Sequence, residues 1–205
     1  MPAMRYLTVS LCFACLGPVA LNARAAELVS KPEIIREEAT APLAPADDRL
    51  NALYQSLKKE RSPESARAIA DQIRETGTLS GSATIDMLMA NCSKALADKR
   101  YGAALDFVDQ VTLLQPDYAE GWNRRATIHY LMGNYAKSMS DTARTLALNP
   151  RHLGALSGLA GILEDTGRDA QALKAWESYL SYYPADRDAQ KEALDLVNKL
   201  TGQKT

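Results

Sequence analysis

Three prolines, Pro116, Pro150 and Pro184, follow one another at intervals of 34 residues. A fixed period of this length is typical of proteins built from helical hairpins, in which each repeat contributes two helices. Neither helix of such a repeat can bury its apolar stripe alone, so the core forms when successive hairpins stack. The spacing of the prolines therefore predicts an all-α fold before any other feature is considered.

Each repeat divides into two apolar runs of helical spacing around a short polar break. Residues 156–163 place apolar side chains at i, i+3, i+4 and i+7, as an amphipathic helix does. Gly133 and Gly167 fall at equivalent breaks, where a glycine can end the first helix of a hairpin. The closing proline stands just after the second helix, which it cannot continue.

The pattern over residues 85–184 resembles the tetratricopeptide repeat (TPR) family. The resemblance rests on Trp122 with Ala126, on Gly-Asn-Tyr at 133–135 and on Leu-Ala-Leu-Asn-Pro at 146–150. It implies a right-handed α-solenoid of helical hairpins that presents a surface to a partner. The three TPR-like repeats are expected at residues 85–118, 119–152 and 153–186.

The segments on either side of the repeats are expected to cap the array, because three repeats are near the minimum for a stable stack. Residues 47–76 have the apolar spacing of a degenerate helical hairpin. Residues 187–205 predict a last helix and tail, with Leu194, Val197 and Leu200 facing inward.

The N-terminal residues 1–25 have the features of a cleavable signal peptide. Arg5 precedes an apolar stretch over residues 6–21, and Ala-Arg-Ala at 23–25 offers a cleavage site. The apolar stretch is too short and too interrupted to favour a membrane span. The sequence predicts a periplasmic protein without an integral membrane segment after cleavage, and a flexible arm over residues 26–46. An uncleaved membrane anchor is the alternative, because Arg24 is unusual at such a site.

The mature chain would keep a single cysteine and a nearly neutral charge. Cys12 and Cys15 lie in the signal segment, so Cys92 has no partner for an internal disulfide, and it is expected to be buried. Removing residues 1–25 takes away two arginines and no acid, which leaves 22 basic against 25 acidic residues, a net charge of −3. This balance does not indicate a nucleic-acid partner, which would require a clustered basic surface.

No set of residues predicts catalysis, a metal site or a cofactor. The two histidines, His129 and His152, have no spaced Cys, Asp or Glu ligands, and no serine lies in a nucleophile-elbow motif. Gly154, Gly158 and Gly161 faintly resemble a phosphate-binding loop, but they fall inside an expected helix without a preceding strand. Close helix contact, or an open bottom of a groove, explains these glycines better.

The resemblance implies that the first helix of each repeat lines a concave groove. The partner-binding residues expected from it are Met89, Ser93, Leu96, Asn123, Arg124, Thr127, Tyr130, Leu131 and Glu164. The lysine and asparagine clamp with which some relatives hold a C-terminal carboxylate is not reproduced. Only Asn123 and Arg124 resemble part of it.

Arg125 stands where the family usually has leucine, on a helix face that is normally buried. An unpaired buried arginine would cost several kcal/mol, so Arg125 is expected to pair with Asp109 or Asp141. Such a pair would set the stacking of adjacent repeats. The alternative is that Arg124 or Arg125 holds an anionic ligand group. Trp122 and Trp176 are both expected in the core.

These features predict a non-enzymatic, exported interaction module that binds an extended or helical peptide of an envelope protein. One alternative is a structural accessory or homo-oligomeric part of a periplasmic assembly, for example in cytochrome maturation, cell-wall synthesis or secretion. A carrier of a small molecule or lipid is a third class, which would require an apolar cavity.

Overall fold

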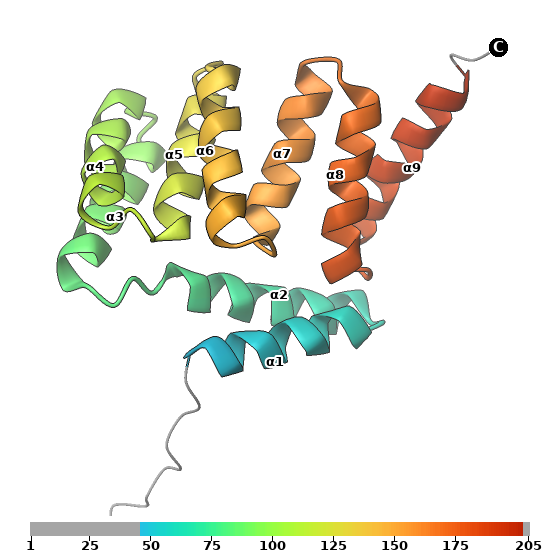
Figure 1. Cartoon of the computed structure of the whole chain (residues 1–205), viewed down its shortest axis with the longest axis horizontal. Helices are drawn as coiled ribbons and strands as arrows, with labels where there is room; N and C mark the ends of the chain where they lie inside the picture. The colour runs from blue at the N-terminus through green and yellow to red at the C-terminus, as the bar shows by residue number, and fades with distance from the viewer. Residues whose placement is uncertain (1–45, 203–205) are drawn as a thin grey trace, which may run out of the picture. The chain divides into compact units, whose positions relative to one another are not determined.

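A computed structural model of the protein describes residues 46–202, which form nine α-helices and no strand (Figure 1). The helices are α1 (Ala46–Lys59), α2 (Pro63–Thr78), α3 (Ala83–Ala97), α4 (Tyr101–Leu114), α5 (Ala119–Leu131), α6 (Tyr135–Leu148), α7 (Leu153–Asp165), α8 (Asp169–Tyr182) and α9 (Arg187–Gly202). The predicted all-α fold of stacked hairpins is confirmed. The predicted signal peptide and, apart from Ala46, the predicted arm lie outside the described residues. No helix within 46–202 combines the length and the hydropathy needed to cross a bilayer.

The pairs α3/α4, α5/α6 and α7/α8 form three hairpins that stack in chain order, each against the next. Gly133 and Gly167 occupy the turns of the second and third hairpins with φ of 72° and 70°. This left-handed conformation closes the end of a helix and favours glycine. Lys99 holds the equivalent place in the first hairpin with φ of 57°, at a steric cost that a glycine would avoid.

Small residues separated by the repeat period lie where the helices of each hairpin touch. Cys92, Ala126 and Ala160 are 0%, 4% and 0% exposed. The prediction that Cys92 is buried is confirmed, and burial raises the pKa of its thiol. A thiol in this setting is less nucleophilic than a free cysteine, because the thiolate form is disfavoured.

The sequence predicted that residues 47–76 would cap the array. In the structure the hairpin formed by α1 and α2 does not cap the first repeat. Tyr54, Leu57 and Ile73 belong instead to the same apolar core as Tyr179 and Tyr183 at the end of α8. The two tyrosines offer a large aromatic surface, and their burial to 8% and 6% exposure favours this arrangement over stacking on α3. Figure 1 shows α1 and α2 running across the ends of the repeat helices.

Polar contacts fix the hairpin to the turns between repeats. Tyr54 Oη donates a hydrogen bond to the Arg151 carbonyl at 2.7 Å, and the Arg151 guanidinium lies 4.4 Å from the centre of the Tyr54 ring. After α2 the chain returns to the first repeat, where Tyr118 Oη donates to the Thr78 carbonyl at 2.6 Å. The hairpin therefore contacts the last repeat, while the C-terminal end of α2 is hydrogen-bonded to the turn that follows the first repeat.

Helix α9 covers α8, but with a face different from the predicted one. Leu194 and Val197 are 58% and 39% exposed, whereas Ala189 and Leu196 are buried and Leu200 is half-buried. The prediction is wrong for Leu194 and Val197, because the buried stripe of α9 is out of phase with them by part of a turn.

Candidate partner-binding groove

A hollow of about 260 Å³ lies between the first helices of the second and third repeats. Its walls combine hydroxyl and amide side chains with alanine, isoleucine and the exposed backbone of glycines. The lining residues are Asn123, Ala126, Thr127 and Tyr130 of α5, Gly154, Ser157, Gly158, Gly161 and Ile162 of α7, and Ser138 and Thr142 of α6. Three of the predicted groove residues, Asn123, Thr127 and Tyr130, are therefore brought together here.

Three of the five α7 residues that line this hollow are glycines, which leave backbone uncovered. A Cβ atom added at Gly158 or Gly161 would meet no heavy atom within 4 Å, so neither glycine is needed for close helix contact. Of the two explanations offered for these glycines, an open groove bottom fits Gly158 and Gly161, and close helix contact does not. Gly154 differs, because its added Cβ would lie 3.4 Å from the Asn123 amide. Glycine in a helix interior costs about 1 kcal/mol relative to alanine, and here no packing offsets that cost.

A second hollow, of about 380 Å³, lies between α3 and α5. Met89 and Ser93 of α3 and Arg124 of α5 line it, together with Asp86 and with residues that end α2. Six of the nine predicted residues thus line one of two neighbouring hollows along the first helices of the repeats.

The other three predicted residues lie outside both hollows. Leu96 is half-buried and packs against the core of the first repeat. Leu131 is 48% exposed at the end of α5. The Glu164 carboxylate accepts a hydrogen bond from Trp176 Nε1 of α8 at 2.7 Å, which occupies one of its oxygens within the repeat.

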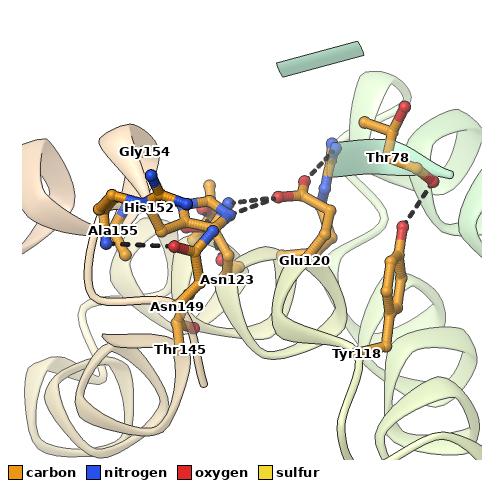
Figure 2. A network of polar contacts seen from close by, with 12 residues as sticks. Thr78, Tyr118, Glu120, Asn123, Thr145, Asn149, His152, Gly154 and Ala155 are labelled. Carbon is orange, nitrogen blue, oxygen red and sulfur yellow. Dashed lines mark hydrogen bonds and ion pairs between the residues drawn. The ribbon is translucent and has the colours of Figure 1, made fainter. Parts of the chain in front are cut away.

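Glu120 lines neither hollow and is not among the nine predicted residues, but it holds two groove residues, Asn123 and Arg124. It is 8% exposed, and its carboxylate accepts hydrogen bonds from Asn123 Nδ2 at 3.0 Å and Arg124 Nη2 at 3.0 Å. Its Oε2 also lies 3.1 Å from His152 Nε2. Figure 2 shows the Glu120 carboxylate facing Asn123 and His152.

The tautomer of His152 follows from its second contact. His152 Nδ1 accepts a hydrogen bond from the Ala155 backbone N–H at 3.1 Å, which caps α7. The ring proton is therefore on Nε2, which donates to Glu120. Burial by itself would raise the pKa of Glu120, but the hydrogen bond from His152 and the positive charge of Arg124 outweigh it, so the pKa is lowered.

The two residues that resemble part of a carboxylate clamp, Asn123 and Arg124, already have a carboxylate partner in the chain. The amide of Asn123 and the guanidinium of Arg124 both donate to a carboxylate that the chain itself provides. A partner's carboxylate would have to displace Glu120 from them. The sequence signal that could have revealed this is an acid three and four residues before the two donors on one helix.

An acidic and aromatic pair lies at the other end of the hollow between α5 and α7. Tyr130 Oη donates to Asp165 Oδ2 at 2.7 Å, and Tyr135 Oη lies 3.4 Å from the same oxygen. The hydrogen bond to Asp165, with partial burial, raises the pKa of Tyr130 to about 12. Asp165, rather than Glu164, is therefore the acid that meets Tyr130.

Arg125 is structural, and both predicted partners contact it. Its Nε and Nη2 donate to Asp141 at 2.8 Å each, and its Nη1 donates to Asp109 at 3.0 Å and to Thr112 at 3.2 Å. Because Asp109 belongs to the first repeat and Asp141 to the second, the guanidinium joins adjacent repeats. The guanidinium also stacks on Trp122, 4.5 Å from the ring centre. Trp122 is only half-buried, so its predicted place in the core is wrong.

Comparison with known proteins places the chain among TPR-containing proteins. No protein-family model matches the sequence. A TPR repeat-containing protein of Rhizobium etli is 45% identical over 205 residues, which are 100% of both chains. The human protein SGT1 homolog is 34% identical over 76 residues, 37% of this chain and 21% of that protein.

A solved structure shows the same fold at lower identity. The first TPR domain of Spaghetti (RPAP3), bound to the HSP90 peptide SRMEEVD, superposes with a TM-score of 0.56 at 21% identity. The match covers 58% of this chain and 95% of that domain. With the full-length relative from Rhizobium etli, these observations lead to one conclusion: the chain belongs to the tetratricopeptide repeat family.

Proposed function

We propose that this chain is a non-enzymatic interaction module of the bacterial cell envelope, which holds a peptide segment of a partner protein along α3, α5 and α7. The observation that carries the proposal is the hollow between α5 and α7. Thr127 is exposed, and the glycines of α7 leave backbone uncovered. Backbone that carries no side chain lets a peptide approach closely.

A protein with the same fold supports the proposal that the groove binds a peptide. The RPAP3 domain, with the same fold, holds an HSP90 peptide. The hollow in this chain is lined by side-chain hydroxyl and amide groups, which can pair with the backbone of a bound segment. A groove of this size favours modest affinity, roughly −8 kcal/mol or a micromolar dissociation constant.

The groove can be tested by site-specific photocrosslinking in living cells. A photoreactive residue at Thr127, which is exposed and lines the hollow, is expected to capture a discrete partner protein. The matched control carries the same photoreactive residue at Ala147, which is exposed on α6 and lines neither hollow. Equal capture from both positions would move the binding surface away from the first helices.

A blocking variant should accompany the crosslink. Ser157→Phe places a large ring at the edge of the hollow without touching the Glu120 contacts, so the free energy of unfolding should change little. Substitution of Asn123 or Arg124 is less suitable, because each would also remove a partner of a buried carboxylate. Loss of the Thr127 crosslink in a stable Ser157→Phe protein is the expected result.

The envelope location rests on residues 1–25, which have the order of a signal peptide. The expected N-terminus of the mature chain, read by mass spectrometry of a periplasmic extract, is Ala26. Recovery of the chain in the cytoplasm with residues 1–25 attached would refute the location, whatever the groove binds.

A second candidate function, part of a homo-oligomeric assembly, is favoured by exposed apolar side chains on the first repeat. Met87, Leu113 and Leu114 are 58%, 79% and 61% exposed, and the α1–α2 hairpin packs on the last repeat instead of on this one. Sedimentation over a range of concentrations tests it. A mass that increases with concentration, and that falls back to the monomer mass in Leu113→Ser, would favour the assembly.

A further inference from the structure

We propose that the groove selects a positively charged peptide segment, rich in lysine or arginine, and rejects an acidic one. This inference rests on the proposed function and names the chemistry of its partner.

Within residues 46–202, Arg124 is the one cation that lines either hollow, and the chain itself already neutralises it. Arg124 lines the hollow between α3 and α5, and its guanidinium donates to Glu120, which is 8% exposed. Since that carboxylate is buried, releasing Arg124 to a ligand would leave a buried charge with one partner fewer. Breaking such a pair costs several kcal/mol, so Arg124 is a poor receptor for an anionic segment.

The acids along the groove have no such partner. Asp165 accepts hydrogen bonds from two tyrosines, and Asp86 accepts one from the Ser80 hydroxyl. Within residues 46–202, neither carboxylate lies in an ion pair with a lysine or arginine. Both are exposed at the surface of the protein. Neutral hydroxyl donors leave the negative charge of a carboxylate in place, so each remains available to a cation.

The two acids are placed where a bound segment would pass. Asp86 lines the hollow between α3 and α5. Asp165 accepts a hydrogen bond from Tyr130, which lines the hollow between α5 and α7. A lysine or arginine beside Asp165 would also meet the ring of Tyr130, where a cation–π contact adds to the ion pair. The groove thus offers an anionic group at each hollow and an aromatic surface next to one of them.

An acidic segment meets the opposite conditions. It would face Asp86 and Asp165, and no free cation among the described lining residues would offset them. Like charges across an interface are disfavoured. The acidic HSP90 peptide SRMEEVD, held by the RPAP3 domain, has a composition that this groove should therefore exclude.

The test is a selection of short random peptides on the immobilised full chain, followed by binding measurements with synthetic peptides. Selected peptides are expected to carry a net positive charge. The variant Asp86→Asn/Asp165→Asn keeps an oxygen acceptor at each position, so the tyrosine and serine hydrogen bonds can persist. Exposed ion pairs contribute modestly to binding, so the loss of both should weaken binding of the best basic peptide on the order of tenfold.

The matched control removes the same charge from second helices of the repeats. Asp106 of α4 and Glu177 of α8 are both exposed and line neither hollow. Asp106→Asn/Glu177→Gln should bind the basic peptide as the wild type does. Raising the ionic strength should weaken wild-type binding more than binding by the groove variant, because exposed charges are screened.

Each outcome bears on one of the two proposals. Selected peptides that are neutral or acidic, or equal loss of affinity in the groove variant and the control, would overturn the charge preference and leave a peptide groove standing. Failure to select any peptide, or selected peptides that still bind after Ser157→Phe, would overturn the groove itself. Melting temperatures of all variants close to that of the wild type are required for either conclusion.

Discussion

Replacing Arg125 with methionine should lower the free energy of unfolding more than the same replacement at an arginine in an exposed ion pair. The methionine keeps much of the length of the arginine stem but leaves Asp141, 7% exposed at its side chain, as a buried carboxylate without its bidentate partner. Removing one partner of a buried pair costs about 3–5 kcal/mol. Because the Arg125 side chain is 21% exposed and Asp109 is 58% exposed, we expect the lower end, about 3 kcal/mol.

The assay is urea unfolding of the full chain, followed by circular dichroism and by tryptophan fluorescence. A loss of about 3 kcal/mol corresponds to a melting temperature lower by roughly 6–12 °C for a chain of this size. Arg125→Lys keeps the charge but cannot form both bonds to Asp141, so it should lie between the wild type and Arg125→Met. Replacing Asp141 by leucine together with Arg125→Met should recover part of the loss, since no buried charge remains.

One result would refute this reasoning. If Arg125→Met costs less than about 1 kcal/mol, the ion pair behaves as an exposed one and does not join the repeats energetically. Measuring the loss at low and high salt provides a check, because a buried pair is screened little by added ions.

Three further predictions concern the groove and the hairpin. Gly158→Ala and Gly161→Ala should each raise the free energy of unfolding by up to about 1 kcal/mol in urea titrations, since the added methyl groups meet open space, and should weaken peptide binding. Glu120 has a lowered pKa in the folded protein, so its stabilising contribution is present above pH 4.5, its reference value, and is lost as the pH falls through the folded pKa. The difference in stability between the wild type and Glu120→Gln should therefore shrink from pH 7 to pH 3 in unfolding titrations, and a constant difference would contradict the assignment. Tyr54→Phe removes the hydrogen bond to the Arg151 carbonyl and should cost about 1 kcal/mol, with faster amide hydrogen exchange in α1 and α2.

The repeat period predicts contacts between consecutive repeats, but it does not predict contacts that lie outside the repeat pattern. Contacts of Arg125 with Asp109 and Asp141 were predictable, because the period places those residues on helices next to α5. The position of the α1–α2 hairpin was not predictable, since a repeat pattern specifies contacts between consecutive repeats only. Tyr179 takes part in this unpredicted contact: it is 8% exposed, and its hydroxyl donates to Asp186 at 2.7 Å.

The candidate site was predicted in outline and not in its electrostatics. The family pattern places Thr127 and Tyr130 on the groove face of α5, and both line the hollow. The contact between Glu120 and His152 joins residues 32 positions apart, through a turn whose exact course no local pattern defines. Tyr130 bonds Asp165 rather than the neighbouring Glu164, a difference of one residue that depends on the rotation of α7.

The docking of α1 and α2 on the last repeat has a consequence for how the chain acquires its structure during synthesis. The hairpin leaves the ribosome before α3, but the α7 and α8 side chains that share its core are translated about a hundred residues later, as the Tyr54 to Arg151 separation of 97 shows. Most repeat arrays can grow from one end by adding neighbours. Here the first helices must wait with apolar side chains uncovered until the third repeat has formed. Non-local contacts of this kind slow folding and prolong exposure to aggregation.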